Sequence, residues 1–166
     1  MKFRVEHTFR NITVQEYEQL YFTEEFNIAM CTAVKLARNL VERTVTGDHI
    51  HRIVTVGPDR EIPPAAAKIL GASKIEYTEH LDYDFGSYKG TWKTISSLLT
   101  EKVDTHGTFA FTERSGQVVR IVDGLIKVNI FGVGAVVEKF IVADIEKSYE
   151  RVAEFTQRWI DGGGKL

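Results

Sequence analysis

The sequence predicts an α+β fold in which one antiparallel sheet carries one long amphipathic helix. Residues 2–10 alternate apolar and polar side chains, strand-like runs joined by turns fill residues 36–131, and the apolar period becomes helical after Gly134. The chain has 166 residues, of which 43% are hydrophobic and 27% charged. This is enough for one domain with a real core and a modest cavity. We therefore treat residues 1–166 as a single domain.

The first part of the chain predicts one strand followed by two short helices. One face of the strand carries Phe3, Val5, His7 and Phe9, which is typical of a half-buried strand. Thr13 and Glu16 have the spacing of a capping box and predict a helix over "TVQEYEQLYF". A second helix is expected over "TEEFNIAMCTAV", where acidic residues in the first turn suit the helix dipole.

Six further strands are expected between residues 36 and 131, which gives seven in all. A hairpin around Gly47 and Asp48 spans "LARNLVERTVTGDHIHRIVTV". After "GPDREIPPAAAKILG", which predicts a short Ala-rich helix, come "KIEYTEHLDYDF" and "TWKTISSLLTEK", joined by "GSYKG". The last pair is "GTFAFTE" and "QVVRIVDGLIKVNIF".

The C-terminal helix has one apolar stripe about six turns long. Its members are Val136 or Val137, Phe140, Ile141, Ile145, Tyr149, Val152, Phe155 and Trp159. Before it stands "VNIFGVGAVVEKF", whose Gly132 and Gly134 suggest a dinucleotide-binding loop. That fingerprint needs a third glycine where the chain has Val137, and a parallel crossover that the antiparallel run does not supply. We interpret the glycines as a hinge between strand and helix.

Composition argues against several classes of protein. The formal charge of −2 and the dispersed Lys and Arg residues give no basis for nucleic-acid binding. No stretch approaches the roughly 20 apolar residues of a membrane span, and the N-terminus lacks the hydrophobic region of a signal peptide. The lone Cys31 lies in an apolar context, which indicates a packed thiol in a reducing compartment. We expect a cytoplasmic protein without integral membrane association.

The chain resembles the START-like helix-grip superfamily, the SRPBCC group that includes pollen-allergen-like proteins. The resemblance rests on the order of elements over essentially the whole chain. "MKFRVEHTF", "YFTEEFN", "IEYTEHLDYDFGSYKGTW" and "GVGAVVEKFI" are more similar to an uncharacterised bacterial branch, known as a domain of unknown function. The resemblance implies a curved seven-stranded sheet wrapped around the C-terminal helix, with an apolar cavity between them. Members are carriers as well as enzymes, so it implies no single reaction.

Strand parity places four polar side chains on the apolar faces of their strands. Glu79 shares a face with Tyr77, Leu81 and Tyr83, and Arg120 shares one with Val118 and Val122. By the same reasoning His7 and Arg52 point inward. One interpretation is that these residues pair with one another, or that a bulge returns some of them to solvent. The other is that they bind a ligand, with Glu79 and Arg120 orienting its polar head or Glu79 acting as a general base.

The remaining candidates are apolar or aromatic. Side chains that either line or fill a cavity are Tyr77, Tyr83, Trp92, Phe109, Phe111 and Phe140. In an antiparallel sheet the segments 57–73, 102–107 and 132–135 should meet where the long helix begins. There Ile69 and Leu70 either plug the end of the sheet or form a lid, with Pro63 and Pro64 stiffening it.

The sequence therefore favours a binding or carrier protein for a hydrophobic small molecule such as a lipid, sterol or polyketide. The alternatives are a cyclase- or dehydratase-type enzyme that uses the same cavity, and a co-chaperone-like module whose cavity is filled. No cofactor is predicted. His49 and His51 lie two apart on one strand face, but without a third ligand they predict a solvated pair rather than a metal site.

Overall fold

The computed structural model describes residues 1–58, 63–71, 74, 76–97 and 100–164, apart from the side chains of residues 58, 66, 69 and 70. Its elements are β1 (Lys2–Phe9), α1 (Val14–Phe22), α2 (Glu24–Ala33), β2 (Leu36–Thr46), β3 (His49–Pro58), α3 (Pro64–Leu70), β4 (Tyr77–Asp84), β5 (Lys89–Ser96), β6 (Val103–Arg114), β7 (Gln117–Val128) and α4 (Gly134–Asp161).

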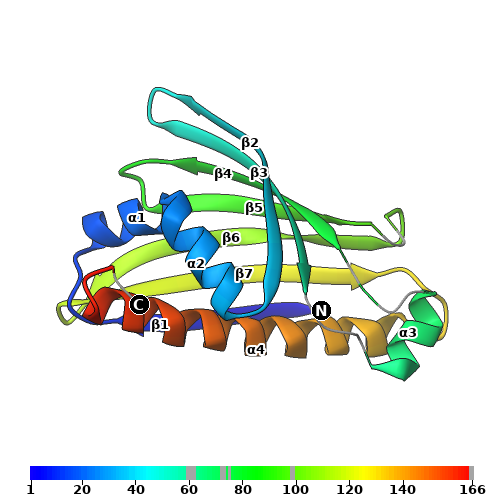
Figure 1. Cartoon of the computed structure of the whole chain (residues 1–166). Coiled ribbons are helices and arrows are strands. Elements are labelled where there is room, and N and C mark those ends of the chain that lie inside the picture. The colour runs from blue at the N-terminus through cyan, green and yellow to red at the C-terminus, as the bar shows by residue number, and fades with distance from the viewer. Residues whose placement is uncertain (59–62, 72–73, 75, 98–99, 165–166) are drawn as a thin grey trace.

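The seven strands form one antiparallel sheet in the order β1-β7-β6-β5-β4-β3-β2. Helix α4 lies along one face and packs against β1 and β7, while α1 packs against β6 and α2 contacts both β2 and α4 (Figure 1). We call this the inner face of the sheet and the opposite one the outer face. The prediction of a curved seven-stranded sheet with one long C-terminal helix and two short helices after the first strand is confirmed.

The local signals act as the sequence predicts. The Thr13 hydroxyl accepts from the Glu16 amide at 3.2 Å, and the Glu16 carboxylate accepts from the Thr13 amide at 2.8 Å, so the capping box is formed. Helix α4 buries Val137, whereas Val136 is 65% exposed. The stripe therefore runs through Val137.

The junction between β7 and α4 corrects one detail of the glycine interpretation. The left-handed backbone is at Gly132, with φ of 79°, and Gly134 does not share it. Gly134 is required for a different reason, because a Cβ at this position would lie 2.3 Å from the carbonyl oxygen of Val128. The hinge thus combines one special backbone conformation with one close approach.

Two strand boundaries differ most from the prediction. Strand β5 ends at Ser96 rather than at Lys102, and the Thr100 hydroxyl donates to the Ser96 carbonyl at 3.0 Å. Residues from Val103 onward, predicted as a connection, belong to β6 because Thr105 pairs with β5 on one side and β7 on the other.

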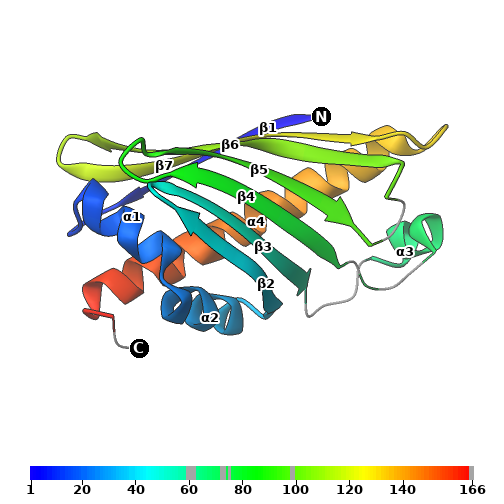
Figure 2. The ribbon, with the colours of Figure 1, turned by 90° about the horizontal axis from the view of Figure 1, so that it is seen from above.

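The ends of β3, β5 and β7 lie at the same end of the sheet, where α4 begins and where α3 is also found (Figure 2). This agrees with the strand directions expected from the sequence. In the described part of the chain, no helix has the length and apolar character needed to cross a bilayer.

The inner face is shaped by a cross-strand glycine pair. Gly107 on β6 is paired with Gly124 on β7. The Trp92 ring lies over both, since a Cβ on either glycine would come within 2.8 Å of it. Phe3 lies against the same ring, with centroids 6.2 Å apart. The two missing side chains make room for an indole on the inner face.

Candidate functional site

The four polar residues predicted from strand parity do lie on the inner face. Arg120 is 3% exposed and Arg52 is 6% exposed, so both guanidinium groups are buried among apolar side chains. The side chain of Glu79 keeps 26% of its surface accessible, and His7 is also mostly covered. Parity alone was sufficient to identify these positions.

Arg52 on β3 and Glu79 on β4 form an ion pair. Arg52 Nη2 donates to Glu79 Oε1 at 3.3 Å, and the guanidinium carbon lies 5.8 Å from the centroid of the Phe22 ring. The expectation that inward polar residues pair with one another is therefore correct here. The partner of Glu79 is Arg52 and not Arg120.

Arg120 on β7 has a different environment. Its Nη2 donates to His7 Nδ1 at 3.3 Å, and its guanidinium carbon lies 5.5 Å from the Phe9 ring centroid and 5.1 Å from that of Tyr149 on α4. Because arginine can only donate, Nδ1 of His7 accepts and Nε2 carries the proton. That Nε2 donates to Glu150 at 3.3 Å. Burial and the neighbouring Arg120 charge lower the pKa of His7, which keeps the imidazole neutral.

Three buried nitrogens on the inner face lack a hydrogen-bond partner among the described residues. They are Arg52 Nε, Trp92 Nε1 and Arg120 Nε. All three are donors without acceptor capacity, and a buried donor left unpaired costs about 1–3 kcal/mol. The inner face thus has a surplus of N–H groups and a shortage of acceptors.

Three tyrosines from different elements lie near the Arg52–Glu79 pair and Arg120. Tyr21 on α1, Tyr77 on β4 and Tyr149 on α4 each keep part of their surface accessible. Nevertheless burial is the largest cause that raises the pKa of all three hydroxyls. Arg52, Glu79, Arg120 and Tyr149 all act on the pKa of Tyr21. The three residues therefore combine partial accessibility with surroundings that disfavour the charged phenolate, within reach of the buried charges.

Other predicted candidates lie in tight packing. Tyr83, Phe109 and Phe111 are at most 3% exposed, and their rings contact one another. Phe109 and Phe111 also contact the ring of Tyr21. Glu18, which sequence reasoning missed, is buried beside them. It accepts from the Tyr83 hydroxyl at 2.6 Å and from the Gly86 amide at 2.7 Å. These contacts fill the part of the interior that lies under α1.

The last candidates divide into described and undescribed positions. Phe140 is half-buried on α4, and Cys31 is a buried free thiol whose pKa is raised by burial, as expected of a packed residue. Ile69 and Leu70 belong to α3, but their side chains lie outside the described residues, as does Ile75. The lid hypothesis stays a prediction.

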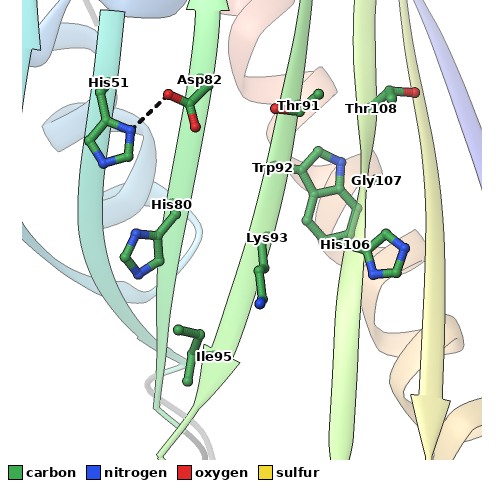
Figure 3. A pocket seen from close by; sticks show the side chains of 10 residues that line it. All are labelled: His51, His80, Asp82, Thr91, Trp92, Lys93, Ile95, His106, Gly107 and Thr108. Carbon is green, nitrogen blue, oxygen red and sulfur yellow. Dashed lines mark hydrogen bonds and ion pairs between the residues drawn. The ribbon is translucent and has the colours of Figure 1, made fainter.

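A second candidate region lies on the outer face, where an open hollow of about 600 Å³ spans β3 to β6 (Figure 3). It is lined by His51, His80, Asp82, Thr91, Trp92, Lys93, Ile95, His106, Gly107 and Thr108. Sequence reasoning missed it because the outward residues of four strands meet only when their register is known. Within the described residues no group of three or more His, Cys, Asp or Glu side chains is placed to hold a metal ion.

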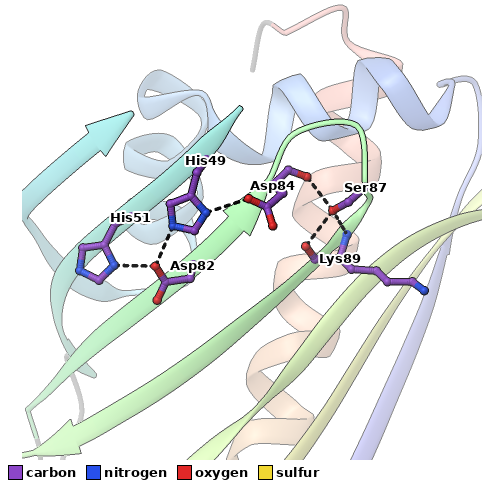
Figure 4. A network of polar contacts seen from close by, with 6 residues as sticks. All are labelled: His49, His51, Asp82, Asp84, Ser87 and Lys89. Atoms are coloured by element: carbon purple, nitrogen blue, oxygen red, sulfur yellow. Dashed lines mark hydrogen bonds and ion pairs between the residues drawn. The ribbon is translucent and has the colours of Figure 1, made fainter. Parts of the chain in front are cut away.

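Beside this hollow, the predicted histidine pair forms a polar network (Figure 4). His49 is paired across the strands with Asp84 and His51 with Asp82. His49 Nδ1 lies 2.8 Å from Asp84, its Nε2 lies 3.1 Å from Asp82, and His51 Nδ1 lies 2.8 Å from Asp82. Hydrogen bonds that the imidazole donates to the carboxylates of Asp84 and Asp82 raise the pKa of His49. Both histidines are engaged by carboxylates in a partly exposed network, which accounts for them structurally.

Comparisons with known proteins give a family and a fold. The family model "Protein of unknown function (DUF2505)" matches residues 4–160. No curated protein matches significantly. TTHA0849 from Thermus thermophilus has a similar structure, with a TM-score of 0.65 at 10% identity over 99% of this chain and 100% of that one. For Ms6760 from Mycobacterium smegmatis the TM-score is 0.61 at 8% identity, over 98% and 92%.

A third structure is DynU16, described as a putative protein in the dynemicin biosynthetic locus. Its TM-score is 0.56 at 10% identity, and the alignment covers 98% of this chain but 48% of DynU16. At such identities these structures share the fold and carry no information on the reaction or the ligand.

Proposed function

Since the chain belongs to the DUF2505 family, whose function is unknown, we propose from its geometry that it binds a hydrophobic small molecule between the sheet and α4. The observation that carries this proposal is the combination found at Tyr21, Tyr77 and Tyr149. An accessible hydroxyl on the outside of a protein is hydrated, and burial does not dominate its pKa. A tyrosine that is partly accessible and yet desolvated is expected where its side chain forms the wall of an internal recess.

The chemistry around the three tyrosines suits a ligand. Apolar side chains dominate, among them Ile141 and Ile145 of α4. A few polar groups converge from β3, β4 and β7, and a mainly apolar wall with few oriented polar groups is the usual composition of a small-molecule site. The outer-face hollow is less suitable because it is open, and its residues His51 and His106 already have carboxylate partners.

The contacts favour binding over catalysis. His7 accepts from Arg120 through Nδ1 and donates to Glu150 through Nε2, so neither nitrogen is available as a base toward the interior. Glu79 is held by Arg52. A general base must reach the proton that it removes, and these two candidates are both occupied. We propose a carrier or receptor rather than an enzyme.

The proposal is tested by titration with N-phenylnaphthylamine, a neutral fluorescent probe, together with native mass spectrometry of the protein from cells. We expect saturable fluorescence enhancement that is abolished by Tyr149→Trp, which enlarges the side chain next to Arg120, and unaffected by Phe131→Trp. Phe131 is a fully exposed aromatic residue between β7 and α4. No saturable binding, and no retained small molecule, would refute the function.

A further inference from the structure

Arg120 is a buried cation without a carboxylate partner among the described residues. Its neighbours are the neutral imidazole of His7, the rings of Phe9 and Tyr149, and the buried Tyr17, on whose hydroxyl pKa Arg120 acts through its charge and a hydrogen bond. All of these neighbours are neutral. Glu150, the acid nearest to His7, has a side chain that is 68% exposed and bonds to the far nitrogen of the imidazole. Buried charges in proteins are usually paired with an opposite charge, so this arrangement needs an explanation.

Among the described residues, three other acids on this side of the protein are engaged elsewhere. Glu79 pairs with Arg52, and Glu18 is bound by Tyr83 and Gly86. Asp144 of α4 acts on the pKa of Tyr77 and has an interaction partner of its own. In the described part of the chain, Glu79 is thus the carboxylate paired with one of these two buried arginines, Arg52, and the unbalanced positive charge is that of Arg120 on β7.

The unpaired atom shows which chemistry is missing. Arg120 Nε is buried and has no acceptor in the described part of the protein. A carboxylate has two acceptor oxygens and binds a guanidinium through parallel hydrogen bonds, which a neutral oxygen does not reproduce. The partly accessible Tyr149 lies against the same guanidinium. Since Arg120 Nε is itself covered, a ligand would approach it beside Tyr149.

We propose that Arg120 is the receptor for a carboxylate group, and that the natural ligand is an amphipathic monocarboxylic acid whose apolar body lies along α4. This inference rests on the proposed function and makes it more specific. His7, Phe9 and Tyr149 fix the position of the guanidinium. The ligand then supplies the counter-ion and the missing acceptor.

The experiment compares dansylaminoundecanoic acid with its methyl ester, two fluorescent probes that differ in charge and share the same chain. The acid is expected to bind wild type about tenfold more tightly than the ester, since hydrogen bonds to charged groups contribute about 1.5–3 kcal/mol. Because the site is buried, this preference should persist at high salt, where attraction to surface lysines is screened.

Three variants assign the preference to one side chain. Arg120→Met should remove the preference for the acid, so that acid and ester bind this variant with equal affinity. Arg120→Lys, which keeps the charge, should retain part of it. Arg4→Met is the matched control, because Arg4 is an exposed arginine on β1 that pairs with Asp123. Circular dichroism and N-phenylnaphthylamine binding check that each variant keeps its fold and its site.

The outcomes separate this inference from the proposed function. If N-phenylnaphthylamine binds but acid and ester bind equally to wild type, the carboxylate inference is wrong and the function stands. An acid preference that survives in Arg120→Met, or that disappears at high salt, likewise overturns the assignment. If no probe binds, both are refuted.

Discussion

The two faces of the sheet use the same kinds of polar residue in opposite ways. On the inner face His7 lies beside a buried arginine, and its pKa is lowered. On the outer face His49 lies between two carboxylates, and its pKa is raised. In the outer network each histidine has a carboxylate partner: His49 bonds to Asp84 and Asp82, and His51 bonds to Asp82. The inner group has unpaired donors, which is typical of a binding site that a ligand completes.

This difference also predicts where substitutions should lower the free energy of unfolding the most. A surface network in water loses little when one member is removed, because water replaces the lost hydrogen bonds. A buried arginine cannot be rehydrated in this way. Substitutions of equal chemistry on the two faces should therefore have unequal effects.

The largest difference is expected between Glu79→Ala and Asp84→Ala. Glu79→Ala leaves Arg52 buried without its carboxylate and should lower the free energy of unfolding by about 3 kcal/mol. Asp84→Ala removes an exposed partner of His49 and should cost far less. Chemical denaturation of both variants measures this. Equal losses would mean that the inner ion pair is no more desolvated than the outer one.

A smaller effect is expected from the space under Trp92. Gly124→Ala places a methyl group within 2.4 Å of the Phe3 ring and 2.8 Å of the indole, so both must move. Overpacking of this kind costs about 1–3 kcal/mol. Gly57→Ala is the control, since its nearest neighbour would be at 3.9 Å. A Gly124→Ala variant as stable as wild type would show that the inner face is not closely packed at this point.

The smallest effect concerns pH. Because the pKa of His7 in the folded protein is below its ordinary value of 6.5, its contribution to stability is present above 6.5 and is lost as the pH falls through the folded pKa. His49 has a raised pKa, so its contribution is present below 6.5 and is lost as the pH rises through the folded pKa.

Melting temperatures of His7→Gln and His49→Gln, measured between about pH 5 and pH 8, test this contrast. The advantage of wild type over His7→Gln should grow with pH, and its advantage over His49→Gln should shrink. Two difference curves of the same slope would contradict the assignment of opposite environments to the two faces.

Much of this could be predicted from the sequence because it depends on local periodicity. Alternation placed His7, Arg52, Glu79 and Arg120 on the inner face, and the helical stripe identified α4. What could not be predicted depends on register and packing. The pairing of Glu79 with Arg52, the Trp92 indole over paired glycines, and the burial of Glu18 against Tyr83 each join residues distant in sequence. No local pattern specifies such contacts.

The outer hollow illustrates the same limit. His80 and His106 occupy outward positions, and each is paired across the strands with Lys93 on β5. Alternation alone shows that they point outward. Only the register of three strands shows that they border one recess.

The central claim is that the inner face, and not the outer hollow, receives the ligand. Quenching of tryptophan emission by dibromostearic acid tests it most directly, with stearic acid as the non-quenching control. In Trp159→Phe the remaining indole is that of Trp92, which lies on the inner face beside Phe3. In Trp92→Phe only Trp159 remains, and it packs on Phe26 and Phe155 near the end of α4.

We predict saturable quenching in Trp159→Phe that is much stronger than in Trp92→Phe and is reversed by excess stearic acid. Because Trp92 also borders the outer hollow, the measurement is repeated with Thr108→Arg added, whose long side chain obstructs that hollow. The quenching should persist unchanged in this double variant. Binding of the brominated acid that leaves the emission of Trp92 unchanged, or quenching that Thr108→Arg abolishes, would contradict the account.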